Sequence, residues 1–169
     1  MLSITSGSRN MTMGYRSLRF LTTGSSNIAI GQDSGENLTN RSNNVLIGQE
    51  TLENSNSSGC VAIGHQAIDT SSNTGDYSIA IGYRSGRSFS TQQGLIAIGY
   101  QASHSHTSGA DSVTIGRSAG YNNTTGGSRT IIGSFAGQYN TGFGNTALGA
   151  YALRGASSGT VAGAYNVAI

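Results

Sequence analysis

One short phrase returns at a nearly constant interval along almost the whole of this 169-residue chain. The chain reads SIAIGYRSG over Ser78–Gly86, LIAIGYQAS over Leu95–Ser103 and SVTIGRSAG over Ser112–Gly120. Each copy contains a glycine, here called the motif glycine, and successive motif glycines are 16 to 18 residues apart. They are Gly14, Gly31, Gly48, Gly64, Gly82, Gly99, Gly116, Gly133 and Gly149. A tenth copy begins at Asn166, so the pattern predicts about ten stacked units rather than one globular core.

Each copy begins with the alternating pattern of a β-strand. Apolar residues, mostly β-branched, stand one and three positions before the motif glycine. These pairs are Met11/Met13, Ile28/Ile30, Val45/Ile47, Val61/Ile63, Ile79/Ile81, Ile96/Ile98 and Val113/Ile115. The residue between them is most often alanine, as at Ala29, Ala62, Ala80, Ala97, Ala147 and Ala168. Because successive side chains of a strand point to opposite faces, the pattern predicts a Val/Ile face and an alanine face.

A unit of about 17 residues is too short for a strand and a crossover helix. The sequence therefore predicts an all-β fold: a parallel β-roll, or β-solenoid, of about ten coils that forms one domain over residues 1–169. We expect two short strands and two turns in each coil, and coils spaced about 4.8 Å apart would give a rod roughly 45–50 Å long. Two glycine columns are expected to form corners with positive φ. One is the motif glycine, and the other lies seven positions before it, at Gly7, Gly24, Gly75, Gly109, Gly126 and Gly142.

Such a roll is thin, which raises the question of how it becomes stable. We expect the Val/Ile face to fill the interior, which provides only one or two apolar side chains per strand. That burial is insufficient to offset the entropy of ordering about 17 residues per coil. Small alanines on the outer face would let neighbouring chains approach closely, which predicts a homo-oligomer with cyclic symmetry. The alternative is that the alanines face solvent.

Several copies resemble the head repeats of trimeric autotransporter adhesins, and more closely the longer repeats of that class in phage tail fibres and other viral fibre proteins. The segments that carry the resemblance are NTALGAYAL (Asn145–Leu153), GCVAIGHQAI (Gly59–Ile68) and AGYNNTTGGSRTIIGSFAG (Ala119–Gly137). The resemblance implies a homotrimer of left-handed parallel β-rolls. Parallel crossovers are right-handed as a rule, and this class is an exception to it.

Motifs and charge exclude several other classes of function. The sequence contains no G-x-S-x-G, H-E-x-x-H or phosphate-binding loop, so no enzyme activity and no cofactor are predicted. All nine basic residues are arginines scattered over many coils, whereas nucleic-acid binding favours a continuous basic stripe. The sequence contains no run of 18 apolar residues, so no membrane helix is predicted. The N-terminal segment lacks the apolar run of a signal peptide.

The positions just after the motif glycine are long, polar or aromatic, and they are the candidate ligand-binding site. Tyr83 and Tyr100 are expected to stack on neighbouring coils, with Arg84, Gln101 and Arg117 beside them. An aromatic surface bordered by planar hydrogen-bond donors suits a sugar ring. The alternative is a cross-strand aromatic pair that only stabilises the sheet.

The histidines and the cysteine give weaker signals. His104 and His106 would share a face of an extended segment, and H-x-H pairs in viral fibres as a class bind iron at a three-fold axis. The alternative is a pair of exposed loop histidines, and no metal site is predicted. The single Cys60 takes a position that is asparagine in other coils, which indicates a turn residue rather than a nucleophile.

The sequence therefore predicts a structural and adhesive segment of a trimeric fibre in a virion, of the phage tail or head fibre type, that contributes to host attachment. Its expected partners are two further copies of the chain, other fibre or virion proteins at its ends, and a host surface glycan or protein. The main alternative is the head of a bacterial surface adhesin. A further alternative is a self-assembling or ice-binding β-solenoid. Ice binding favours a regular file of threonines, which the chain does not have.

Overall fold

The computed structural model describes residues 4–69, 75–89, 93–155 and 163–169. Within these residues the chain is all-β, without a helix, and its strands form one parallel sheet in strict chain order. The strands are β1 (Met11–Met13), β2 (Ile28–Ile30), β3 (Val45–Ile47), β4 (Val61–Ile63), β5 (Ile79–Ile81), β6 (Ile96–Ile98), β7 (Val113–Ile115), β8 (Thr130–Ile132), β9 (Thr146–Leu148) and β10 (Val167–Ala168). The predicted parallel β-solenoid is confirmed.

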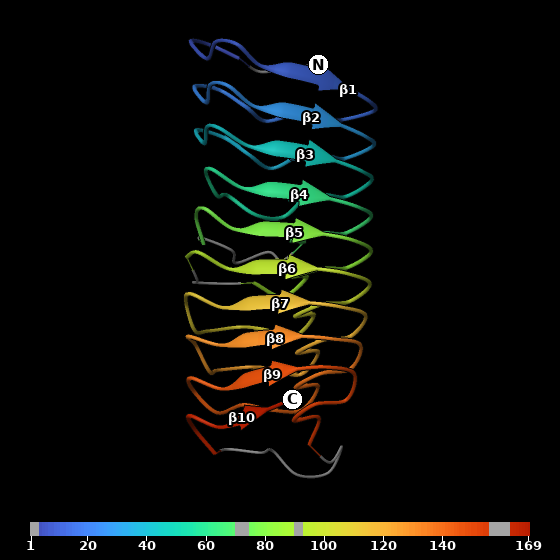
Figure 1. Cartoon of the computed structure of the whole chain (residues 1–169). Helices are drawn as coiled ribbons and strands as arrows, with labels where there is room; N and C mark the ends of the chain where they lie inside the picture. Colours follow the sequence, from blue (N-terminus) through green and yellow to red (C-terminus); the bar gives the residue numbers. More distant parts are fainter. Residues whose placement is uncertain (1–3, 70–74, 90–92, 156–162) are drawn as a thin grey trace.

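The strands stack directly above one another because equivalent positions of successive repeats pair. Ala80 of β5 pairs with Ala97 of β6, and the same register holds from β1 to β10. In Figure 1 each strand crosses the front of the roll, and the chain returns behind it one level further toward the C-terminus. This path is a left-handed coil, as the resemblance implies.

The motif glycines form one corner of every coil, as predicted. Their φ angles lie between 122° and 136°, a region that residues with a Cβ rarely adopt. At Gly99 an added Cβ would also lie 2.6 Å from the carbonyl oxygen of Gly116 in the next coil. In the second glycine column the prediction of positive φ holds at Gly109 (φ 121°) but is wrong at Gly7, Gly24, Gly126 and Gly142. Gly24 instead lies so close to the carbonyl of Arg41 that a Cβ would overlap it.

The return side of each coil is built from turns, and in the described residues the predicted second strand does not form. The residues two and four positions after the motif glycine are left-handed, for example Arg84 (φ 51°) and Leu18 (φ 49°). Alternating left-handed residues cannot form an extended strand. Backbone hydrogen bonds still join neighbouring coils here, such as Leu18 N–H to the Ser34 carbonyl (3.0 Å).

The alanine face lies inside the roll, so both predictions for its position were wrong. Ala29, Ala62, Ala80, Ala97 and Ala147 are fully buried within the single chain. Across a narrow interior, these alanines face the small residue that lies three positions after the motif glycine. Where this residue is Ser17 or Ser85, its hydroxyl donates to a carbonyl of the strand. These bonds run from Ser17 Oγ to the Ala29 carbonyl (3.1 Å) and from Ser85 Oγ to the Ala97 carbonyl (2.7 Å). Because the walls are this close, the small side chains point inward and Val and Ile point outward.

At two levels of the interior, a large side chain on the strand is compensated by a glycine on the return side. Where the inward strand residue is large, as at Leu46 and Ile131, the nearby position on the return side is Gly35 or Gly137. A Cβ on Gly137 would lie 2.9 Å from Ile131 Cδ1, and one on Gly35 would lie 2.8 Å from Leu46 Cδ1. Dense packing at these two levels therefore requires glycine opposite the large strand residue.

A buried asparagine ladder joins the first coils. The Asn44 backbone N–H and side-chain Nδ2 both donate to Asn27 Oδ1, at 3.1 and 3.0 Å. Asn27 makes the same two bonds to Asn10, at 3.0 and 3.1 Å. Cys60 continues the column, with its backbone N–H donating to Asn44 Oδ1 (3.0 Å). These bonds satisfy buried polar groups at the corner that leads into each strand.

Candidate functional site

The outward side chains of the strands form a continuous apolar ridge along the sheet. The apolar ridge comprises Met11, Met13, Ile28, Ile30, Val45, Ile47, Val61, Ile63, Ile79, Ile81, Ile96, Ile98, Val113, Ile115, Ile132 and Leu148. The in-register pairing places each ridge residue directly above the equivalent one of the next strand. Met13 is 70% exposed and Ile47 is 38% exposed. A contiguous apolar surface of this kind makes the ridge a candidate interaction site.

The predicted aromatic ladder exists and is longer than expected. Tyr83 stacks on Tyr100 with ring centroids 5.2 Å apart and planes 10° from parallel. His65 stacks on the other face of Tyr83, at 5.4 Å and 11°. Both faces of the Tyr83 ring are therefore covered by neighbouring rings. Tyr83 is 37% and Tyr100 49% exposed, and at Tyr83 the ring edge and the hydroxyl group are the parts available to a ligand.

The other predicted ligand-binding residues lie at different distances from this ladder. The Arg84 guanidinium carbon lies 5.0 Å from the centre of the Tyr83 ring, and Arg84 Nε donates to Gln66 Oε1 (2.7 Å). Gln101 is half-buried beside Tyr100, with its backbone N–H bonded to the Tyr83 carbonyl (2.9 Å). Arg117 is exposed but lies over the Phe135 ring at 4.6 Å. The structure thus groups Tyr83, Arg84, Tyr100 and Gln101, while Arg117 belongs to another cluster.

That second aromatic cluster was not found from the sequence. Phe135 stacks on Tyr151 at 5.4 Å, and Arg154 lies 5.3 Å from the Tyr151 ring centre. Arg154 Nε also donates to Gln138 Oε1 (2.9 Å). The signal was present in the repeat, because the aromatic residue moves from the first to the second position after the motif glycine in these coils.

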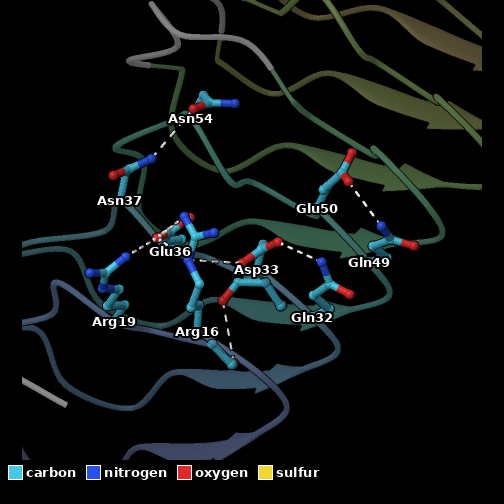
Figure 2. Close-up of polar contacts among 11 residues, drawn as sticks. Arg16, Arg19, Gln32, Asp33, Glu36, Asn37, Gln49, Glu50 and Asn54 are labelled. Carbon is cyan, nitrogen blue, oxygen red and sulfur yellow. Dashed lines mark hydrogen bonds and ion pairs between the residues drawn. The ribbon is translucent and has the colours of Figure 1, made fainter. Parts of the chain in front are cut away.

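Charged residues gather at the corner of the first coils (Figure 2). Arg16 donates through Nε and Nη2 to the two carboxylate oxygens of Glu36, each at 2.7 Å. Arg19 reaches the same carboxylate at 3.2 Å. The N-terminal arginines could have been unpaired surface groups or docking residues for an acidic neighbour. Two of them instead pair with a buried glutamate of their own chain.

One level further along, three carboxylates approach one another without an arginine. Glu50, Glu53 and Asp69 each place an oxygen within 4.8 Å of the others. Gln66 Nε2 donates to Glu50 (2.6 Å) and Asn54 Nδ2 donates to Asp69 (2.9 Å). Burial, followed by the charges of Asp69 and Glu50, raises the pKa of Glu53 to about 7. This carboxyl therefore takes up a proton close to neutral pH.

The structure separates the two histidines of the H-x-H segment. His104 is half-buried on the outside of the roll, where its ring stacks on Tyr121 at 4.7 Å. His106 is fully buried and meets the edge of Phe89, with centroids 6.2 Å apart. The segment is a turn rather than an extended strand, so its alternate residues do not share a face. The two rings are not arranged as a ligand pair within the chain.

Comparisons with known proteins add no family. No protein-family model matches the chain, and searches of curated proteins and of solved structures return no significant match. Across the residues that the structure describes, no helix has the length and apolarity needed to cross a membrane.

Proposed function

We propose that this chain is a structural and adhesive segment of a trimeric fibre of the phage tail or head fibre type, without enzyme activity. The observation that carries the proposal is the apolar ridge. It runs along consecutive strands of the stack, and it is built mainly from Val and Ile, which have high β-propensity. A lone chain in water would leave this surface partly exposed along its length, most of all at Met11, Met13, Ile28, Ile47 and Leu148.

A second copy of the same chain is the partner that the ridge fits. The ridge repeats with the coil spacing, so an identical ridge offers side chains at the same interval along the rod. Packing the ridges together would add a common apolar core outside the small interior of each roll. Three copies around one axis follow from the resemblance of the repeats to trimeric fibre and adhesin heads.

The aromatic ladder is proposed as the surface that contacts a host glycan. Neighbouring rings cover both faces of Tyr83, so a sugar chain would lie along the rod and meet the hydroxyl edges of Tyr83 and Tyr100. Arg84 and Gln101 supply planar hydrogen-bond donors beside these edges. Other fibre or virion proteins would join the segment at its ends.

Replacing ridge residues tests the proposal directly. Threonine keeps the β-branch and already occupies the first ridge position at Thr130 and Thr146, so the strands should still form. The variant carries Ile79→Thr, Ile81→Thr, Ile96→Thr and Ile98→Thr. We expect sedimentation velocity to show loss of the trimer while circular dichroism keeps its β signal.

The matched control places threonine at exposed positions away from the ridge, in a Gln32→Thr and Gln49→Thr variant. This control should assemble like the unmodified chain. An unchanged assembly in the four-residue ridge variant would contradict the proposal, because the ridge would then not be the contact between copies.

A further inference from the structure

One inward-facing column of the roll changes from apolar to polar in its C-terminal half. The position seven residues after the motif glycine points inward, and in the first coils it is Leu21 or Leu38. In later coils the same position is polar and fully buried, at His106, Asn123 and Asn140. Arg129 joins them from the column that elsewhere holds the asparagine ladder. A polar group of four residues thus replaces the usual leucine core.

Arg129 carries a charge into this interior without a counter-ion from the protein. Arg129 is only 1% exposed. The seven acidic residues of the sequence all lie within the described part of the chain, and none of them forms an ion pair with Arg129. Burial lowers the pKa of Arg129 to about 10, which still leaves the guanidinium charged at neutral pH. An isolated buried charge is costly unless it is compensated.

The hydrogen bonds of this polar group leave two buried N–H donors, one on Arg129 and one on Asn140, without a partner in the described part of the chain. Nη1 donates to the Asn140 carbonyl (3.1 Å), and Nη2 lies 3.3 Å from His106 Nε2. Arg129 Nε and Asn140 Nδ2 have no acceptor among the described residues. Both are buried, and buried N–H groups normally find an acceptor.

His106 adds one more free donor in either tautomer. Burial and the charge of Arg129 lower the pKa of His106 to about 3, so the ring is neutral at pH 7 and carries one proton. If the proton is on Nε2, it bonds the Ser108 carbonyl (3.1 Å) and Arg129 Nη2 loses its acceptor. If Nε2 accepts from Arg129, the proton lies on Nδ1, which has no partner among the described residues.

We propose that a small monovalent anion, chloride under ordinary conditions, binds inside the roll between Arg129, His106 and Asn140. One such ion would compensate the guanidinium charge and accept from the donors that these three side chains leave free. Water could accept hydrogen bonds but would not neutralise the charge. Enclosed by successive coils, the ion would bind as the C-terminal half folds and would bind the unfolded chain far less well.

The test measures the unfolding temperature of the full chain in sodium chloride, sodium bromide and sodium gluconate at equal ionic strength. We expect the midpoint to rise with halide concentration and to stay constant in gluconate, because gluconate is too large for the site. An Arg129→Asn variant, which restores the usual residue of the column, should lose this halide dependence. The matched control Arg154→Asn, at an exposed arginine, should keep it.

A crystal grown in bromide gives a readout that needs no variant. We expect an anomalous peak within hydrogen-bond distance of Arg129 and Asn140. The inference is overturned if the unmodified chain unfolds at the same temperature in all three salts, or if Arg129→Asn keeps the same halide dependence. A crystal with water and no bromide at this position would overturn it equally.

Discussion

The hydroxyl of Ser85 donates to the carbonyl oxygen of Ala97 across the inside of the roll, over 2.7 Å. This short distance between opposite walls leaves no room for a longer side chain at Ala97. We expect Ala97→Leu to lower the free energy of unfolding by about 1–3 kcal/mol through overpacking, as measured by chemical denaturation.

Ala110→Leu is the matched control, because Ala110 is exposed and the substitution is chemically identical. It should change the free energy of unfolding by no more than about 0.5 kcal/mol. Equal stability of the two variants would show that the alanine face does not line the interior.

The motif glycine is expected to be the least replaceable residue of each coil. Gly99→Ala introduces a Cβ at φ 134° and against the Gly116 carbonyl, so it should cost at least about 2 kcal/mol of stability. Gly94→Asn is the control, since Gly94 has a φ of 69° and the equivalent position in another coil is Asn43, with a φ of 64°. Thermal unfolding of both variants should show a large decrease for Gly99→Ala and a small one for Gly94→Asn.

The strands could be predicted because a motif glycine follows each of β1 to β9 and the alternation before it has period two. The inside of the roll could not be predicted in the same way. Alternation defines two faces but does not say which is buried, and Val and Ile are buried more often than Ala in proteins generally. Here the distance between the walls decides, since Ser17 and Ser85 bond directly to the opposite strand and a small residue is required at Ala29 and Ala97.

The candidate site was predicted only in part for a related reason. Tyr83 and Tyr100 stack because residues one repeat apart lie one strand spacing apart, which the period alone indicates. The position of Arg117 depends on its side-chain conformation and on the ring of Phe135, which lies two positions after the motif glycine of the next coil. The period of the repeat does not encode either of these. The ion pairs of Glu36 likewise depend on long side chains that reach between columns.

Glu53 should make stability depend on pH near neutrality. Its pKa is raised from 4.5 to about 7 in the folded chain, so folding favours the protonated form. The stabilising contribution is therefore complete below about pH 4.5 and is lost as the pH rises through 7. We expect Glu53→Gln to unfold at a higher temperature than the unmodified chain at pH 8, with the difference disappearing near pH 4.

Glu36→Gln is the control for that experiment, because it removes a carboxylate that bonds Arg16 and Arg19. It should lower the unfolding temperature at pH 8 instead of raising it. A Glu53→Gln variant that is less stable than the unmodified chain at pH 8 would show that the Glu53 charge has a stabilising partner.

The aromatic ladder predicts a specific effect on glycan binding. Tyr83→Ala combined with Tyr100→Ala removes two stacked rings, which should cost about 0.5–1.5 kcal/mol of stability per lost pair but leave the assembly intact. We expect binding on an array of bacterial surface polysaccharides to be abolished in this variant. Tyr15→Ala is the control, since Tyr15 occupies the same column, is exposed, and is not part of the stack. Unchanged binding in the double variant would assign the ladder a purely structural role.

The mass of the unmodified chain in solution is the most direct measure of whether the apolar ridge joins copies into a fibre segment. Multi-angle light scattering on a size-exclusion column should give three times the chain mass of 17.3 kDa, at every concentration at which the β signal is present. A folded, stable monomer of 17.3 kDa would contradict the trimer and, with it, the proposed role of the ridge.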